Sequence, residues 1–180
     1  MTPILIALWL LLVHGALGGF DTFYNHEWRE RLPRRPEAAT ELALHSARSW
    51  AFALMFTGLA WLEWHGLWGW VLLGLVGVEY VITLADSVVE DRTRTLSGVE
   101  RINHMLLGLN TGLYTAFIAT EVILRWRHLP TALVPVTHGV LSWLLSACAL
   151  VIVVWAVRDG IAAGRQRRAS QNDLGVVHVA

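Results

Sequence analysis

The sequence predicts an all-α, polytopic membrane protein with five transmembrane helices, four of them forming a bundle around a polar site near the cytoplasmic face. Of its 180 residues, 55% are hydrophobic and only 16% are charged, a balance too apolar for an ordinary soluble domain. Five apolar runs approach the length of about 20 residues that a helix needs to cross the hydrocarbon. The formal net charge is zero, which gives no general reason to expect nucleic-acid binding.

The five expected helices follow these runs in order. The first, 3–20, is interrupted only by His14 and lacks the basic segment that precedes the apolar stretch of a cleaved signal peptide, so we expect it to remain as a helix. The others are 49–62, extended back to about Glu37 by a helical pattern, then 67–85, 102–123 and 133–157. Pro135 falls in the first turn of the last helix, where a missing amide donor costs little. Residues 1–159 are expected to form a single transmembrane domain, and 160–180 a disordered cytoplasmic tail.

The distribution of arginine predicts the orientation. All basic residues of the chain are arginines, and the connection after the fourth helix holds only Arg125 and Arg127. The opposite face holds many more: Arg29, Arg31, Arg34, Arg35, Arg92, Arg94, Arg101, Arg158, Arg165, Arg167 and Arg168. The positive-inside rule therefore puts this arginine-rich face in the cytoplasm and the N-terminus outside. We expect the membrane to be a bacterial inner (plasma) membrane.

Acidic and histidine side chains gather at the helix ends that meet on the cytoplasmic face. The sequences ELALH and ERINH place Glu41 with His45, and Glu100 with His104, one turn apart on a helix face. The full boundary set is Asp21, His26, Glu41, His45, Asp86, Glu90, Glu100 and His104. These positions predict one polar site built from four helices.

A second, deeper pair lies below this boundary set. His14 is seven residues inward from Asp21, and Glu79 is seven inward from Asp86. Seven residues span roughly 10 Å and return to the same helix face. An unpaired charge at that depth would cost several kcal/mol, so we expect His14 and Glu79 to pair.

This set of side chains predicts a metal centre. Carboxylates and imidazoles suit iron, manganese or zinc, and the single cysteine, Cys148, cannot form a thiolate cage. Glu41 or Glu90 would act as a base, and Arg48 would bind an anionic substrate headgroup or pair with a ligand carboxylate. The expected metal ligands are Asp21, His26, Glu41, His45, Asp86, Glu90, Glu100 and His104, with His14 and Glu79 as further candidates.

The order carboxylate, Glu/His pair, carboxylate, Glu/His pair resembles the ferritin-like di-iron and di-manganese carboxylate bundles, which use Glu from two helices and Glu-x-x-His from the other two. The resemblance covers about ten side chains, and the pairs here are spaced i, i+4 instead of i, i+3. It implies a dinuclear centre held between helices.

The functional hypothesis is a membrane metalloenzyme acting on a lipid or other hydrophobic small molecule. Oxidative chemistry, which needs an electron donor, is favoured over zinc-type hydrolysis because the acids outnumber the histidines. Two alternatives stay open: a bis-histidine haem protein with His45 and His104 as axial ligands, and a cation or proton transporter with His14 and Glu79 as a relay. The sequence indicates no oligomeric state.

Simpler interpretations exist for some of these residues. Ser97 and Glu100 form a capping-box pattern, so Glu100 is either a helix cap or a ligand. Glu37 follows Pro36 and fits the first turn of a helix, where the dipole favours an acid. Glu27 and Glu30 lie among arginines and fit a solvated, salt-bridged loop.

Overall fold

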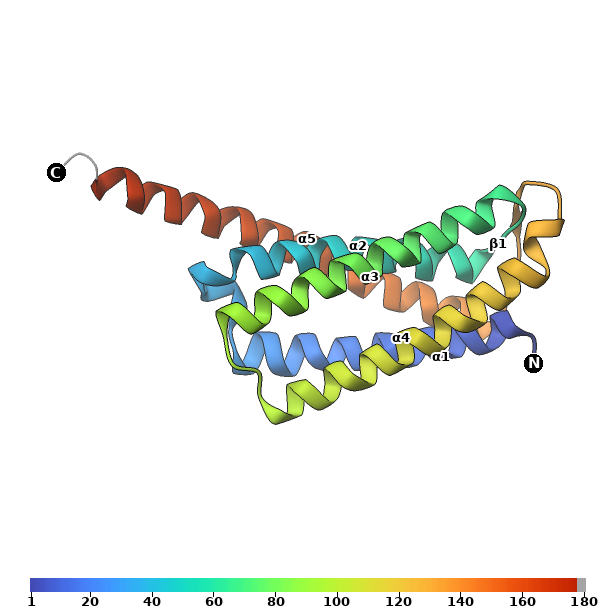
Figure 1. The fold of residues 1–180 in the computed structure, drawn as a ribbon, viewed down its shortest axis with the longest axis horizontal. Coiled ribbons are helices and arrows are strands. Elements are labelled where there is room, and N and C mark those ends of the chain that lie inside the picture. Colours follow the sequence, from blue (N-terminus) through green and yellow to red (C-terminus); the bar gives the residue numbers. More distant parts are fainter. Residues whose placement is uncertain (178–180) are drawn as a thin grey trace.

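The structure, a computed structural model, describes the backbone of residues 1–177 and the side chains of residues 1–170. The chain is all-helical, as predicted, and its five α-helices are shown in Figure 1. They are α1 (Pro3–Phe20), α2 (Ala39–Trp61), α3 (Leu67–Thr93), α4 (Gly98–Leu124) and α5 (Val140–Val177). The remaining elements are a π-helix (Asp21–Arg29), 3-10 turns (Leu32–Arg34, Pro36–Ala38, Trp126–His128) and strands β1 (Leu62–Trp64) and β2 (Leu133–Pro135).

Among the described residues, four helical segments are long and apolar enough to cross a membrane, one fewer than the sequence predicted. They are Pro3–Arg29, Leu67–Thr93, Gly98–His128 and Val140–Ser170. The α-helix missing from this set is α2, although its 23 residues are long enough to cross a membrane. Its first half, however, carries Glu41, His45 and Arg48, and these lower its apolar character.

The start of α5 differs from the prediction. Residues 133–135 are not helical but form β2, which pairs antiparallel with β1 so that Leu62 lies opposite Pro135. Gly139, with φ of +63°, then turns the chain into α5 at Val140. A glycine is favoured there because side chains disfavour positive φ. His138 therefore lies before the helix and not within it.

The end of α5 also differs. We expected residues 160–180 to be disordered, yet the helix continues to Val177. The segment 161–168 is rich in alanine, arginine and glutamine, which favour helix. Gln166 also stabilises this part of α5, because its side-chain amide donates hydrogen bonds to the backbone oxygens of Leu32 (3.3 Å) and Pro33 (2.7 Å). Residues 178–180 of the expected tail lie outside the described residues.

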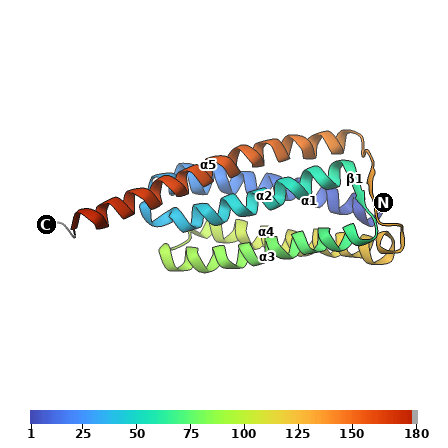
Figure 2. The same ribbon diagram turned by 90° about the horizontal axis from the view of Figure 1, so that it is seen from above.

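The helices pack with α2 between α3 and α5, and with α1 against α4 and α5 (Figures 1 and 2). Two asparagines of α4 fix the register of the α1–α4 pair. The side-chain amide of Asn103 donates to the backbone oxygen of Leu17 (3.3 Å), and that of Asn110 to Leu10 (2.9 Å). Both donors and both acceptors are seven residues apart, so the two antiparallel helices are joined at two matched levels. Interhelical hydrogen bonds of this kind are typical of apolar helix pairs.

The two ends of the molecule differ in packing. At the end that carries β1 and β2, the helices bury a continuous apolar core: Ile4, Leu8, Leu11, Met55, Phe56, Leu59, Leu72, Val76, Tyr114, Ile118, Val122 and Leu145. The opposite end holds most of the buried ionisable residues: Asp21, His26, Glu41, His45, Asp86, Glu90 and Glu100. The fold therefore has an apolar half and a polar half, and the polar half holds the candidate site.

Candidate metal centre

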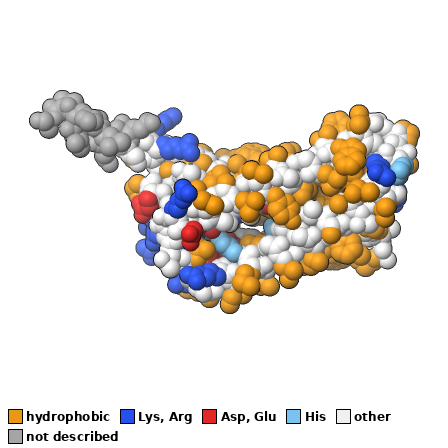
Figure 3. All heavy atoms as spheres, viewed as in Figure 1, with side chains coloured by type: hydrophobic (Ala, Val, Ile, Leu, Met, Phe, Trp, Pro, Cys, Tyr) orange, Lys and Arg blue, Asp and Glu red, His pale blue; other side chains and the backbone are white. Residues whose placement is uncertain are grey.

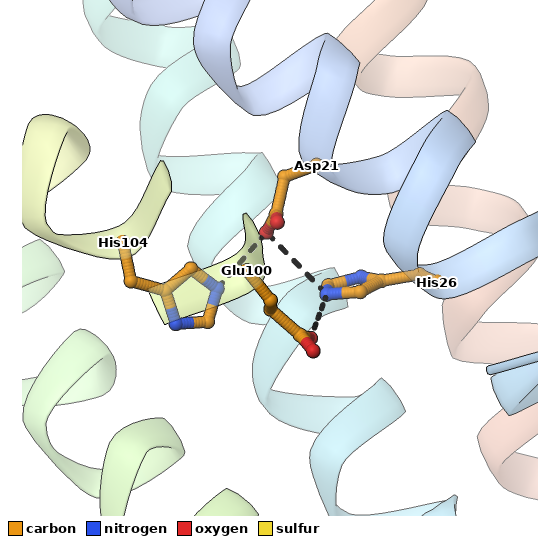
Figure 4. Close-up of side chains that lie close together, drawn as sticks. All are labelled: Asp21, His26, Glu100 and His104. Atoms are coloured by element: carbon orange, nitrogen blue, oxygen red, sulfur yellow. Dashed lines mark hydrogen bonds and ion pairs between the residues drawn. The ribbon is translucent and has the colours of Figure 1, made fainter. Parts of the chain in front are cut away.

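Four chain segments bring seven carboxylate and imidazole side chains together. One group is Asp21, His26, Glu100 and His104, shown in Figure 4. The other is His26, Glu41, His45 and Glu90. Within each group, one potential ligand atom per residue lies within 4.8 Å of all the others, and His26 belongs to both. We call these seven residues the donor cluster. All are buried except His104, which is half-buried.

The π-helix after α1 explains how Asp21 and His26 come to the same place. Its backbone bonds run from residue i+5 to residue i, as from the Glu30 amide to the Asn25 oxygen (2.8 Å). Residues five apart therefore share a face, and Oδ2 of Asp21 lies 3.4 Å from Nε2 of His26. Asn25 donates to Oδ1 of Asp21 (2.7 Å) and fixes the carboxylate. This helix was not predicted from the sequence, because its five-residue spacing matches neither the α-helical nor the β-strand period.

The start of α4 contributes Glu100 and His104. The hydroxyl oxygen of Ser97 accepts a hydrogen bond from the backbone amide of Glu100 (3.1 Å), so Ser97 caps the helix. The Glu100 side chain turns to the donor cluster, where Oε1 lies 3.9 Å from Nε2 of His26 (Figure 4). One turn later, Nε2 of His104 lies 3.2 Å from Oδ2 of Asp21, and Nδ1 lies 3.6 Å from Oε2 of Glu90. Glu100 thus takes part in the helix cap through its backbone amide and in the donor cluster through its carboxylate.

Arg94 lies among the carboxylates and was not expected from the sequence. Only 6% of its side chain is exposed, and it pairs with Glu41 (2.9 Å), Glu90 (3.1 Å) and Glu100 (2.7 Å). Burial alone would lower the pKa of Arg94, but the hydrogen bonds and charges of Glu41 and Glu100 raise it above its usual range. The i, i+4 spacing of Glu90 and Arg94 is the feature of the sequence that could have predicted this ion pair.

Asp86 lies beside the donor cluster and belongs to neither group of four. Its Oδ2 lies 3.0 Å from Nε2 of His45 and 3.1 Å from Nη1 of Arg48. A carboxylate bound to one nitrogen of a histidine orients the ring and leaves the other nitrogen for a metal. The His45 ring also stacks on His26, with centroids 4.5 Å apart and planes 4° apart. Arg48 is held by Asp86 and was expected either to form such a pair or to bind substrate.

The carboxylates of the site outnumber its guanidinium groups, so their charges do not cancel. Five carboxylates (Asp21, Glu41, Asp86, Glu90 and Glu100) face two guanidinium groups (Arg48 and Arg94), which leaves three negative charges. Protonation of all three histidines would supply the difference. The face-to-face contact of His26 with His45 opposes that, because like charges so close together repel. Divalent cations fit this donor set and this charge.

The deeper residues His14 and Glu79 do not form the expected ion pair, and neither belongs to the donor cluster. Tyr114 lies between them. Its ring meets His14 edge-on, with centroids 5.4 Å apart, and its hydroxyl donates to Oε2 of Glu79 (3.5 Å). Thr83 donates to the other Glu79 oxygen (2.7 Å). The aromatic ring of Tyr114 separates the two groups that helix geometry alone put at one level.

A cavity of about 540 Å³ joins the donor cluster to this deeper level. Asp21, Glu90 and His104 line one end, and His14 and Glu79 line the other. Its walls include apolar residues from every α-helix: Phe52, Phe56, Leu84, Leu107, Val151, Ile152 and Trp155, with the glycines of α1. The volume and the mainly apolar lining are typical of a small-molecule site. The sequence assigned no part of the site to the fifth helix, whereas α5 supplies one wall.

Other charged residues form pairs away from the cluster. Glu30 pairs with Arg29 and Arg35, as the salt-bridged interpretation predicted, and Glu27 pairs with Arg158. Glu37 is exposed. At the far end of the molecule, the buried Glu121 pairs with Arg125 (2.6 Å), which also binds Glu63 (2.7 Å). This last group was not predicted, although the i, i+4 spacing of Glu121 and Arg125 indicates it.

Comparison with protein-family models, curated proteins and solved structures found no match to this chain. Its class therefore rests on the fold and the site alone. The described residues form an all-helical structure in which four helical segments are long and apolar enough to cross a membrane, and in which carboxylate and histidine groups lie close enough together to hold metal ions.

Proposed function

We propose that this chain is an integral membrane metalloenzyme whose dinuclear carboxylate/histidine centre acts on a lipid or other hydrophobic small molecule. The observation that carries the proposal is the contact between the donor cluster and the apolar cavity. Asp21, Glu90 and His104 belong to both. Metal ions at the cluster would therefore face a space suited to an apolar substrate.

Membrane placement is part of the proposal. The four apolar segments expose large hydrophobic side chains, such as Val81 and Leu84 on α3 and Met105 and Leu109 on α4. We infer that α2 is a fifth crossing, because its polar residues Glu41 and His45 are buried among the other helices. The excess of arginine at the cluster end favours a cytoplasmic location for that end in a bacterial inner membrane, with the N-terminus outside.

The donor set suits two ions of iron, manganese or zinc. Such ions would polarise a bound substrate or lower the pKa of bound water, and in an oxidative version they would need an electron donor. Of the two expected bases, Glu90 lines the cavity and Glu41 does not. Of these two residues, Glu90 is therefore the one placed to accept a proton from a substrate.

Metal analysis of the purified protein tests the proposal. The wild type is expected to hold about two ions of iron, manganese or zinc per chain. The double variant His45→Ala/His104→Ala, which removes one imidazole from each group of four, is expected to lose most of them. The matched control is His65→Ala/His138→Ala at the β1–β2 end, which should keep wild-type content. A wild type without these metals, or a double variant with unchanged content, contradicts the proposal, and a Soret absorption band would instead indicate haem.

A further inference from the structure

The deep end of the cavity contains a buried polar group that the proposed metal chemistry does not use. His14 is 8% exposed and lines the cavity, and its Nδ1 is buried without a hydrogen-bond partner among the described residues. Its ring is held on two sides by Phe52 and Tyr114, with centroids 4.7 and 5.4 Å away. A buried polar atom left without a partner costs about 1–3 kcal/mol. The site therefore favours a ligand that supplies the missing hydrogen bond.

The charges around His14 define which group fits. Glu79 lines the same end of the cavity, so a carboxylate or phosphate placed there would be repelled. Among the described residues that line the cavity, the one guanidinium is that of Arg48, and its charge is already paired with Asp86 (3.1 Å). An ammonium group would be attracted by Glu79, but it would have to leave water and pass apolar walls, and the cost of desolvating a charge can exceed the gain from pairing it. A neutral hydroxyl or carbonyl group meets neither obstacle.

The walls of the cavity define the rest of the ligand. Between its two polar ends, Phe52, Leu107 and Ile152 provide apolar surface. The cavity reaches the surface between α3 and α4, where the lining residues Leu84 and Gly108 are exposed. Figure 3 shows this opening between the helices, with histidine side chains visible inside and hydrophobic side chains around it. An alkyl chain fits such a passage.

We propose that the deep end, which we call the His14 pocket, binds a neutral hydroxyl or carbonyl group of a single-chain alkyl compound that enters between α3 and α4. The donor cluster lies about two helical turns away, roughly 10 Å, so the bound group sets which carbon of the chain reaches the metal ions. This last step rests on the proposed function, whereas binding in the His14 pocket does not. The substrate class is thus a long-chain alcohol, aldehyde or ketone.

Equilibrium binding of tritiated dodecanol to the full-length protein tests the His14 pocket, and chelator-treated protein removes any dependence on metal. The variant His14→Phe keeps an aromatic ring of similar size without its nitrogens. Its affinity for dodecanol is expected to fall about tenfold, the value of one hydrogen bond. His138→Phe, outside the cavity, is the matched control and should bind as the wild type does. Unlabelled dodecane, dodecanoate and dodecylamine should each compete about tenfold less well than dodecanol.

The route is tested by two glycines of α4. Gly108 lines the cavity and Gly112 does not, and at both positions a Cβ atom would meet nothing within 4 Å. Gly108→Leu is expected to slow dodecanol binding, and Gly112→Leu to leave it unchanged. Equal rates in the two variants contradict access between α3 and α4.

The remaining outcomes separate this proposal from the proposed function. Three results would each overturn the His14 pocket: no saturable dodecanol binding, wild-type affinity in His14→Phe, or equal competition by dodecane. Equal competition by dodecane would mean that water alone completes the hydrogen bonds of His14. Tight competition by dodecanoate or dodecylamine would overturn the requirement for a neutral group. Metal content is expected to stay at the wild-type level in His14→Phe. Saturable dodecanol binding by a wild type that holds no iron, manganese or zinc as purified would leave the His14 pocket standing and contradict the metalloenzyme proposal.

Discussion

Replacing His26 by alanine is expected to weaken metal binding at the whole centre, by roughly 100-fold or more. His26 is the residue common to the two groups of four, and its Nε2 lies 3.4 Å from Asp21 and 3.9 Å from Glu100. Its ring also stacks on His45 and holds that ligand in place. Its loss therefore removes one donor and releases a second.

The measurement is metal content per chain after purification, followed by titration of the metal-free protein with zinc or manganese. His128→Ala is the matched control, because His128 is exposed at the other end of the molecule. Wild-type affinity for both ions in His26→Ala would show that His26 is not a shared ligand. Loss of one ion with full retention of the other would assign His26 to a single group.

Replacing Arg94 by glutamine is expected to destabilise the metal-free protein by about 3–5 kcal/mol, the cost of breaking a buried ion pair from one side. Arg94 neutralises part of a cluster in which Glu41, Glu90 and Glu100 are all buried. Without it, three carboxylates remain close together without their guanidinium. Their mutual repulsion favours unfolding of the polar half of the molecule.

Thermal unfolding in detergent checks this, with and without a divalent cation. The added ion is expected to stabilise Arg94→Gln more than the wild type, because it supplies the positive charge that the variant lacks. Arg92→Gln is the control, since Arg92 is exposed and forms no ion pair among the described residues. Equal stability of the two variants would contradict the role of Arg94, and an equal metal effect would show that the cation binds elsewhere.

The sequence predicted the helices whose apolar runs were continuous. The runs at 3–20 and 67–85 lie within α1 and α3, since hydrophobicity and length decide such segments. The start of α5 was wrong because apolar residues 133–135 satisfy a strand as well as a helix, and only the pairing with β1 distinguishes the two. The helical state of 160–177 depends partly on Gln166 reaching Leu32, a contact between distant segments.

The candidate site was predictable to the extent that it lies at helix ends. Glu41, His45, Glu100 and His104 follow from i, i+4 spacing and from two helices that start on one face. The contact of Asp21 with His26 was not predictable from α periodicity, because it depends on a π-helix. Nor could spacing separate Asp86, which supports His45, from the residues of the donor cluster, since that distinction depends on side-chain direction.

The two asparagines that join α4 to α1 have a consequence for the timing of synthesis. The contacts of Asn103 with Leu17 and of Asn110 with Leu10 bridge 86 and 100 residues. At translation rates of about 5–20 residues per second, α1 waits roughly 5–20 s before its partner emerges. During that interval Asp21 and His26 lack Glu100 and His104, so the first group of four is incomplete. A metal ion that needs all four residues of this group would therefore be captured only after α4 has been made, and not by the shorter nascent chain.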